Sequence, residues 1–581
     1  MNSKTPQFDA LLQPILDALV PHTRECLWKG KHEHCEGEFE IQEGDIEFLR
    51  MLRVPPPNYC PTCRRMRRLV HMNLTRLFKR SCNAPEHSET MISIIPSECP
   101  FPVYDYQYFI SDAFDPFSFG RTYAGGSPME ELFNLRKVFP MPSFLNRDPS
   151  CINSDYSNGG RDLKNGYFVM GCYRAEDVWY SHLIIGSKMV MDSRAIQNSE
   201  FVYKSVFSEH LFKCSYAYFS NSCTDSMFLF DCRNCQDCFG CVNLRNAKYC
   251  VFNQQLTKEG YMAFLASISP LSRSMLSECE NKFWELVKAE PMNASRNMGS
   301  TGVSGVNIKR CQDLFDAIDS ENTQHVRHVD SVNDHKDSMD VLFSGGNSSM
   351  IYGTTNIGSS SGGVRFSVSS KFCTNSEFVF NSKNISNCFM CFGLQNKSYC
   401  ILNKQYTEEE YYPLVDALKS EMLRRGEYGD GLGMEFSAQA YNFSIGNVSF
   451  PLSGDTIRTL GGYTGEEPET NVGDMGVMQP EDVPETIDEV SDALIAKAMI
   501  CKETGRPFRV IQSELDFYRR MKLPLPTVHP TVRMESSFHM ATMAKKHTVN
   551  CASCQRSIDS MFPKESGFIL YCETCYQKEI L

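Results

Sequence analysis

One stretch of 39 residues occurs twice in this chain, and the repeat narrows the folds that the chain can adopt. Residues 223–261 and 373–411 align without a gap at an offset of 150, with matching Cys, Phe, Leu, Tyr, Asn and Gln positions. Through both halves, short clusters of β-prone residues recur about every eleven residues, separated by Asn, Asp, Ser and Gly. Units of constant length that each supply a strand and a turn are typical of stacked repeats, in which every unit buries side chains against the next.

The predicted fold class is mainly β: two duplicated parallel β-solenoid (β-helix-like) halves with capping helices, flanked by N- and C-terminal zinc-ribbon modules. An antiparallel sandwich also has short, evenly spaced strands, but clear two-residue hairpin turns are missing between the clusters. A capping box at Thr407 and Glu410, and a related signal at Thr257, predict the helices that end the two halves.

Changes in composition along the chain predict its domain organisation. The expected order is an N-terminal helix (1–25), a zinc-ribbon module with a basic helix (26–81), a connector rich in Phe, Tyr and Pro (82–153), the first solenoid half (154–256), a helical segment (257–303), the second solenoid half (304–406), a helix with an irregular segment (407–463), an acidic linker (464–487), a metal-free repeat of the N-terminal module (488–545) and a C-terminal zinc ribbon (546–581).

A second internal repeat, at an offset of 469, relates residues 39–64 to residues 508–533. Both copies predict a short strand, a helix, a Pro-x-Pro exit and a knuckle. In this alignment His32 falls on Cys501, so His32 is the preferred partner of three cysteines, with Cys26 as the alternative. The predicted tetrahedral zinc site has the ligands His32, Cys35, Cys60 and Cys63. The C-terminal copy has Thr504 and Val532 at two of these positions and is expected to bind no metal.

The end of the chain carries the clearest metal-binding motif. Two Cys-x2-Cys knuckles are separated by 17 residues, which is zinc-ribbon spacing, and their ligands are Cys551, Cys554, Cys572 and Cys575. A ribbon of this size buries too little apolar surface to fold without its metal. The sequence therefore predicts structural Zn2+ sites at both ends of the chain.

A basic segment follows the first ribbon. Nine Lys and Arg residues and no acid lie between positions 50 and 80, in a chain with a net charge of −12. One interpretation is contact with phosphate or nucleic acid; the other is pairing with the protein's own acidic residues. The candidate contact residues are Arg64, Arg65, Arg67, Arg68, Arg76, Lys79 and Arg80.

Two further clusters resemble functional sites. Cys232, Cys235, Cys238 and Cys241 have a spacing that suits an iron–sulfur cluster or zinc. The second copy has Ser382, Ile385, Cys388 and Cys391 at these positions, and Ile cannot ligate a metal, so a buried interior position is the favoured interpretation. Residues 319–340 combine three His with several Asp. They suit either a metal or acid–base site, or solvated turns between strands.

The chain is expected to be intracellular. Its first 22 residues predict an amphipathic helix rather than a signal peptide, and no run of about 18 apolar residues predicts a membrane span. In a reducing compartment the 26 cysteines are expected to be thiols or metal ligands.

The chain resembles a family of Cys-rich proteins of no known activity, predicted from environmental bacterial genomes. The resemblance is carried by residues 39–68, 235–261, 388–411, 508–533 and 571–576, which include the Cys-Pro-x-Cys-Arg block, the Cys-rich repeats and the final Cys-x-x-Cys-Tyr. His32 departs from the family pattern, which has Cys there. The resemblance supports the predicted architecture and implies no activity.

No catalytic residue and no organic cofactor is predicted. The leading hypothesis is a zinc-stabilised, non-catalytic structural or interaction scaffold within a larger assembly, with protein partners or further copies of itself and no membrane partner. The alternative is nucleic-acid or ribonucleoprotein binding through the N-terminal ribbon and residues 64–80. A third hypothesis is an intracellular carbohydrate-active β-helix enzyme that uses residues 319–340.

Overall fold

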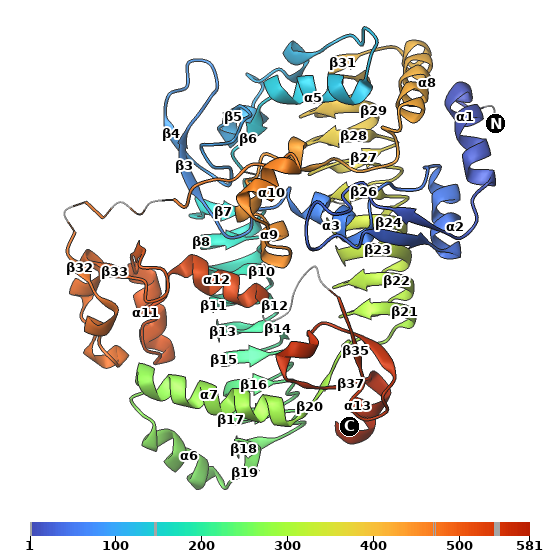
Figure 1. Ribbon diagram of the computed structural model, residues 1–581. Coiled ribbons are helices and arrows are strands. Elements are labelled where there is room, and N and C mark those ends of the chain that lie inside the picture. The colour runs from blue at the N-terminus through green and yellow to red at the C-terminus, as the bar shows by residue number, and fades with distance from the viewer. Residues whose placement is uncertain are drawn as a thin grey trace.

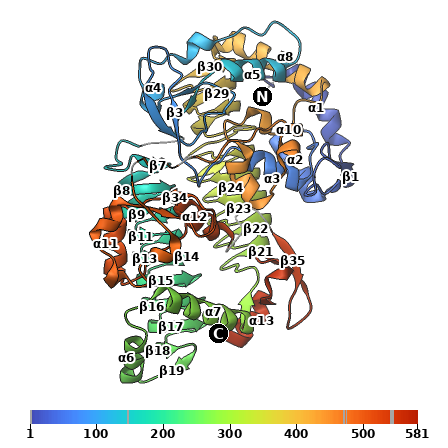
Figure 2. The same cartoon turned by 60° about the vertical axis from the view of Figure 1, so that its left-hand side comes forward.

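The computed structural model describes residues 3–144, 148–358, 360–468, 470, 472–473, 475–539 and 546–580. The remaining positions lie outside the described residues and fall in the predicted connector, second half, acidic linker and C-terminal repeat, and at the two ends. Two stacks of parallel strands lie side by side at the centre of the molecule (Figure 1). They run in opposite directions, from β7 to β19 down one stack and from β21 to β31 up the other (Figures 1 and 2).

The first stack is built from short strands in parallel register. From β8 to β18, paired residues are 12 positions apart, as Cys238 and Cys250 are, so the unit is slightly longer than the eleven residues predicted. Its strands are β7 (Tyr156–Asn158), β8 (Arg161–Met170), β9 (Tyr173–Trp179), β10 (His182–Ile185), β11 (Lys188–Met191), β12 (Arg194–Gln197), β13 (Glu200–Tyr203), β14 (Val206–Glu209), β15 (Phe212–Tyr218), β16 (Thr224–Phe230), β17 (Gln236–Val242), β18 (Lys248–Val251) and β19 (Gln254–Gln255).

The predicted fold class, a mainly β chain of duplicated solenoid halves, is wrong. Helix accounts for 27% of the chain against 33% strand, so the protein is mixed rather than mainly β. Eight strands of the first stack also close into a parallel barrel, in the order β8-β10-β12-β14-β15-β13-β11-β9 and back to β8. The ring closes because β8 pairs with both β9 and β10 at one end, while β15 pairs with both β13 and β14 at the other.

The interior of the first stack alternates apolar and hydroxyl side chains. Val178, Ile184 and Val190 are fully buried, and serines lie midway between them in the sequence. Ser193 is typical: its Oγ donates to the Met191 carbonyl at 2.8 Å and accepts from the Ser205 amide at 3.0 Å. The hydroxyls thus satisfy backbone groups of their own and the next unit, which explains buried polar residues in a narrow core.

A left-handed residue recurs at nearly every third position of the first stack. Asp192, Ala195 and Asn198 have φ of 52°, 54° and 47°. Asn and Asp tolerate this conformation better than other non-glycine residues, because their short polar side chains bond locally. The abundance of Asn and Asp in the sequence therefore reflects backbone geometry.

The second stack repeats the first with two longer steps. The register between Met339 and Tyr352, and again between Tyr352 and Arg365, is 13 residues instead of 12. The offset between the halves therefore falls from 150 to 148, and Asp340 occupies the position of Asp192. Its strands are β21 (Thr301–Val306), β22 (Gln312–Ile318), β23 (Gln324–Val332), β24 (His335–Ser344), β25 (Ser348–Ser349), β26 (Tyr352–Thr355), β27 (Lys371–Thr374), β28 (Glu377–Phe380), β29 (Lys383–Phe392), β30 (Ser398–Ile401) and β31 (Lys404–Gln405).

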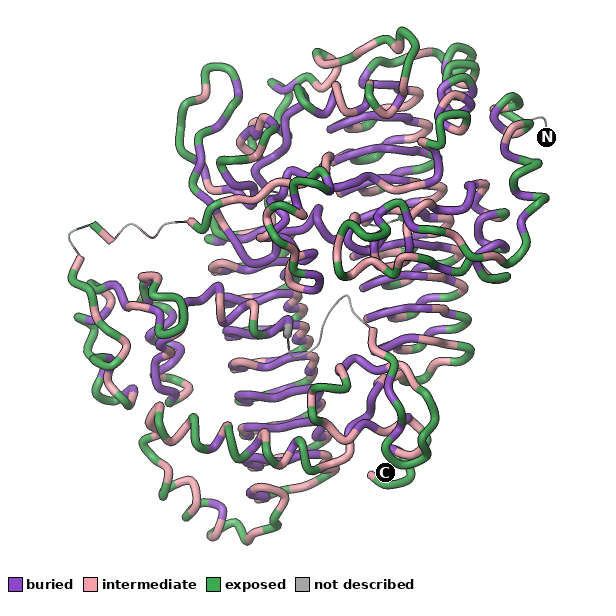
Figure 3. The backbone as a smooth tube through the Cα atoms, viewed as in Figure 1, coloured by how far each residue is buried: buried purple, intermediate pink, exposed green. Residues whose placement is uncertain are grey.

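Helices cover both stacks. On the first stack, Phe283 of α7 (Arg273–Ala289) is fully buried, and the centroid of its ring lies 5.5 Å from that of Phe228. The other helix, α6 (Lys258–Ser267), is more exposed (Figure 3). On the second stack, α8 (Glu408–Arg424) packs against the strands, and α1 (Pro6–Asp17) packs against α8. Asp416 of α8 accepts hydrogen bonds from the amides of Gln7 and Phe8, which satisfies free N–H groups at the start of α1.

The N-terminal module and its predicted metal-free repeat share one order of elements, whereas the C-terminal ribbon has a different order. The N-terminal module consists of β1 (His22–Glu25), β2 (Glu38–Ile41), α2 (Glu43–Leu52) and α3 (Pro61–Leu69). The predicted metal-free repeat has β33 (Ala498–Ile500), β34 (Pro507–Phe508), α11 (Gln512–Met521) and α12 (Pro530–His539). The C-terminal ribbon contains β35 (His547–Asn550), β36 (Ser557–Ser560), η7 (Lys564–Ser566), β37 (Ile569–Tyr571) and α13 (Glu573–Ile580), and β37 pairs with β20 (Pro291–Asn293).

The other elements connect these parts. The segment before the first stack has β3 (Phe78–Ser81), β4 (Thr90–Ser93), β5 (Val103–Tyr104), α4 (Tyr106–Ile110), η1 (Pro116–Phe119), α5 (Pro128–Val138) and β6 (Met141–Pro142). The segment after α8 has η2 (Met434–Phe436), η3 (Tyr441–Phe443), α9 (Ile445–Ser449), α10 (Gly454–Thr459), β32 (Val477–Met478), η4 (Pro480–Asp482), η5 (Ile487–Glu489) and η6 (Asp492–Ala496). Among the helices described, none combines the length and the apolar character needed to cross a bilayer.

Candidate metal centres

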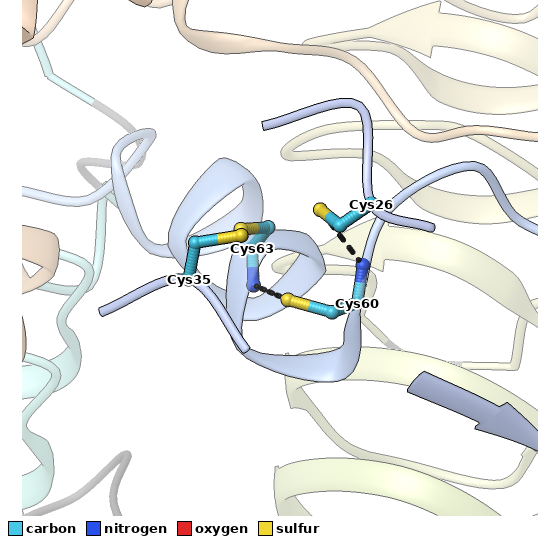
Figure 4. A group of neighbouring side chains, drawn as sticks. All are labelled: Cys26, Cys35, Cys60 and Cys63. Atoms are coloured by element: carbon cyan, nitrogen blue, oxygen red, sulfur yellow. Dashed lines mark hydrogen bonds between the residues drawn. The ribbon is translucent and has the colours of Figure 1, made fainter. Parts of the chain in front are cut away.

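Four cysteines of the N-terminal module converge on one point. Cys26 follows β1, Cys35 lies in the loop before β2, and Cys60 and Cys63 begin α3; their sulfur atoms all lie within 4.8 Å of one another (Figure 4). Cys26, Cys60 and Cys63 are buried and Cys35 is partly buried. Four thiolates in so compact a group can hold a metal ion tetrahedrally.

Backbone amides support this cluster. The Cys26 sulfur accepts hydrogen bonds from the amides of Trp28 at 3.4 Å and Cys60 at 3.3 Å. Hydrogen bonds from the thiols of Cys60 and Cys63 hold the pKa of Cys26 well below its usual range. The contact with Cys26 in turn raises the pKa of Cys60 to about 12. Several thiolates can therefore coexist here only when a cation balances their charge.

The compact group differs in one residue from the preferred prediction of the ligands. Cys26, the alternative, joins the three predicted cysteines, and His32 lies beside them with Nε2 3.3 Å from the Cys63 sulfur. The other ring nitrogen of His32, Nδ1, is buried without a hydrogen-bond partner among the described residues. His32 thus lines the cluster without completing it.

An insertion in the loop after Cys26 explains why the gap-free alignment did not match Cys26 with Cys501. The Cys26 amide donates to the carbonyl of Gly37, and the Cys501 amide donates to that of Arg506 in the same way. Cys26 is therefore the structural counterpart of Cys501, and the N-terminal loop is six residues longer. A gap-free alignment placed His32 there instead. An alignment with a gap in this loop would have placed Cys26 opposite Cys501.

The C-terminal ribbon forms the second four-cysteine group. Cys551, Cys554, Cys572 and Cys575 place their sulfur atoms within 4.8 Å of one another, as the spacing predicts. The Cys551 amide bonds to the Arg556 carbonyl, and its sulfur accepts from the Cys572 amide at 3.2 Å. The knuckle is thus the same as in the other two modules. Cys554 is exposed, so this centre lies closer to solvent than the N-terminal one.

The predicted metal-free repeat, which we call the central module, keeps this fold with only half of the ligands. Cys501 and His529 remain, and the His529 amide donates to the Cys501 sulfur at 3.2 Å. Burial lowers the pKa of His529 to about 3. Among the described residues, only the other two modules bring together a group of ligands that could hold a metal. The apolar frame around Phe508 and Phe517, both buried, holds this copy instead.

The basic segment faces inward. Arg64, Arg65 and Arg68 are at most 7% exposed, although they were candidates for phosphate contact. The Nε atoms of Arg64 and Arg65 lie 2.8 Å from Asp340 and 2.7 Å from Asp330, and Arg68 also reaches Asp340. These arginines thus pair with the acidic residues of the 319–340 segment.

Most of the other basic residues in this segment also form hydrogen bonds or ion pairs within the protein. Arg67 donates to the Gly431 carbonyl, and Arg80 donates to that of Pro96. Arg76 forms ion pairs at 2.8 Å with Glu467 and Glu535. Glu467 belongs to the predicted acidic linker. Lys79 alone among the seven candidates is exposed, so this surface presents little positive charge to a phosphate backbone.

The central module docks on the first stack through an equivalent pair. Arg533, the counterpart of Arg64, donates from Nε to Asp192 at 2.8 Å and from a terminal nitrogen to Glu514 at 3.1 Å. Tyr180 also donates to Glu514, at 3.1 Å. Asp45 is the N-terminal counterpart of Glu514 and contacts His328 at 3.2 Å. Each module therefore binds one stack, and the arrangement is crossed: the first module binds the second stack.

The histidines of the 319–340 segment make internal contacts. His325 lies 2.7 Å from Asp337, and His335 lies 2.8 Å from the Ser344 hydroxyl. Hydrogen bonds to Asp316 and Asp45 outweigh the effect of burial and raise the pKa of His328. The contact of His328 with Asp45 holds α2 against the second stack, a role that the sequence pattern did not reveal.

The cysteine run of residues 232–241 lies inside the first stack. Its four thiols are at most 1% exposed, and each donates to backbone carbonyls, as Cys232 does to Cys241 at 3.3 Å. The run does not appear among the compact ligand groups of the described residues. Its thiols occupy the same kind of position as the interior serines.

Comparison with known proteins gives no indication of what these sites do. No family model matches the chain, and no curated protein is similar to it.

Proposed function

We propose that this protein is a zinc-stabilised, non-catalytic scaffold that assembles with protein partners. Zn2+ would occupy both four-cysteine groups, because four thiolates in tetrahedral reach are the usual ligands of structural zinc. The compact cysteine geometry supports this assignment.

The observation that carries the proposal is the crossed docking of the two modules. The N-terminal module binds the second stack through Arg64 and Asp340, and the central module binds the first stack through Arg533 and Asp192. Cys60 and Cys63 begin the helix that carries Arg64, so a metal there would fix the docking helix. Metal binding would then support the docked arrangement, as expected for structural zinc.

The partners and compartment belong to the same proposal. None of the 26 cysteines forms a disulfide, which is consistent with the proposed reducing, intracellular compartment. The two stacks offer a large surface to a protein partner or a second copy.

Metal analysis tests the zinc assignment. We expect elemental analysis of the full-length protein, purified without added metal, to find two zinc per chain and no iron. Removal of zinc with a chelator should lower the unfolding temperature. Protein that is fully stable without metal, or that carries iron with sulfide, would contradict the assignment.

Sedimentation velocity and chemical cross-linking in cells test the scaffold role. We expect the protein to sediment within a complex larger than one chain and to cross-link reproducibly to the same partner. A monomer in cell extract with no reproducible cross-link would remove the scaffold function and leave the zinc assignment intact.

A further inference from the structure

A cavity of about 360 Å³ lies between the two stacks. Its wall on the first stack includes Phe207, Glu209 and Arg233, and its wall on the second includes Lys309 and Asp319. Cavities of about 300–1,000 Å³ are typical of small-molecule sites. Neither stack alone could form this one.

On the first wall, residues that are 12 positions apart in the sequence lie above one another in successive units of the stack. Glu209, Asn221 and Arg233 are connected by parallel bridges, and Asn221 Nδ2 donates to Glu209 Oε1 at 2.6 Å. Neighbouring strands are about 4.8 Å apart, so a carboxylate, an amide and a guanidinium follow one another at that interval. The rings of Phe207 and Phe219 stack at 5.6 Å and add apolar surface.

The charges of the lining balance. Three acids and three bases face the cavity: Glu209, Asp319, Glu321, Arg233, Arg296 and Lys309. Three of them are paired with residues outside the lining: Arg233 and Arg296 with Asp231, at 3.8 Å and 3.2 Å, and Glu321 with Arg310. The remaining charges do not favour a strongly anionic or a strongly cationic ligand.

Two of the charged groups in the lining could accept or donate further hydrogen bonds. The Lys309 ammonium has no hydrogen bond or ion pair within the described part of the chain, although burial lowers its pKa. Asp319 accepts one hydrogen bond, from Asn307 at 2.6 Å, and burial raises its pKa to about 6. Partly buried polar groups without partners are costly, so a ligand that supplies partners would be favoured.

We propose that this cavity binds a small neutral polyhydroxylated molecule, such as a mono- or disaccharide. Sugar hydroxyls both donate and accept, which matches alternating carboxylate, amide and guanidinium groups. The apolar faces of a sugar ring would lie against the phenylalanine surface. This site goes beyond the scaffold function and does not depend on bound zinc.

Saturation-transfer NMR on the full-length protein tests the site. The probes are glucose and maltose, with glucose 6-phosphate and glucosamine as charged comparisons. We expect saturation transfer to at least one neutral sugar, and weaker transfer to its charged relatives. No transfer to either neutral sugar would overturn the proposal. Binding of glucose 6-phosphate more than tenfold tighter than glucose would also overturn it, since the site would then be an anion site.

Variants show whether binding occurs in this cavity. Glu209→Gln and Lys309→Met each remove a charge from the lining and should weaken sugar binding at least tenfold. Lys248→Met is the matched control, because Lys248 is exposed on β18 and is not part of the lining. Thermal unfolding establishes that each variant is folded. Equal affinity in all three folded variants would place the sugar elsewhere and refute the site. If one lining variant fails to fold, the other decides.

Discussion

Arg64 of α3 and Asp340 of β24 form a buried ion pair, with Nε 2.8 Å from Oδ2. Arg533 and Asp192 repeat this pair at the same distance in the other half of the molecule. The duplicated chain therefore carries two copies of one docking contact. One pair lies between the N-terminal module and the second stack, and the other lies between the central module and the first stack.

Arg64→Met should strongly destabilise the protein. Loss of one partner from a buried pair typically costs about 3–5 kcal/mol. We expect the lower end of this range, because Arg68 still lies 3.1 Å from Asp340. Urea denaturation measures the change in the free energy of unfolding. Arg458→Met is the control, because its pair with Asp455 is exposed and such pairs contribute about 0–1 kcal/mol. A similar loss in both variants would contradict the role of the buried pair.

Glu514→Gln should remove part of the pH dependence of stability. Burial raises the pKa of Glu514 from an ordinary 4.5 to about 7. The folded state binds this proton more tightly, so Glu514 makes stability fall as pH rises from about 4.5 to about 7. Urea denaturation across this range should show a shallower fall in the variant.

Asp45, the residue of the N-terminal module equivalent to Glu514, has a lowered rather than a raised pKa. Although burial opposes it, the contact with His328 and the charge of Arg327 hold the pKa of Asp45 below its ordinary value. Its contribution to stability is present above pH 4 and is lost as pH falls below about 4. Asp45→Asn should therefore reduce stability at neutral pH and leave the effect of Glu514 intact. If both variants responded to pH in the same way, the assignment of the two acids would be wrong.

Cys26→Ser should lower the zinc content from two to about one per chain, while His32→Ala should retain two. The physical reason is that the Cys26 sulfur belongs to the compact group and His32 lies beside it. Elemental analysis of the purified variants distinguishes the two. Retention of both metals in the Cys26 variant with loss in the His32 variant would restore the predicted set of three cysteines and one histidine.

Cys572→Ser should release the C-terminal ribbon from the body of the protein. The strand before Cys572, β37, pairs with β20, so loss of the metal should also loosen residues 291–293. Hydrogen exchange measured by mass spectrometry should rise in both strands and stay unchanged in β16. Unchanged exchange in β20 would mean that the ribbon folds without its metal.

Cys232→Ser should be tolerated, with a change of about 1 kcal/mol or less, within the usual worth of one hydrogen bond. The second stack has Ser382 at this position, and its hydroxyl donates to the Phe380 carbonyl at 2.8 Å. A serine at 232 can make the same bond to Phe230, which now accepts from the Cys232 thiol. Thermal unfolding and elemental analysis measure the outcome. Loss of a metal from this variant would contradict an interior role for the run.

Local patterns predicted many of the elements and most members of the two cysteine groups that could hold a metal. The knuckle spacing of Cys551, Cys554, Cys572 and Cys575 is enough to bring these residues together, because both halves of the ligand set lie in short loops. The comparison of Cys235 with Ile385 also indicated an interior position, and both side chains are buried. Such properties depend on neighbours in the sequence or on a twin position.

Tertiary structure decided what lies far apart in the chain. Whether the arginines of residues 64–68 meet solvent or the acids of the second stack depends on a crossed docking that no local pattern encodes. Closure of the first stack depends on β8 and β15 pairing on two sides, and a one-residue change in unit length shifts which residues face each other. The sequence by itself determined the repeat, the knuckles and the interior residue types. Long-range packing determined barrel closure, the position of Cys26 in the compact group and the partners of the buried charges.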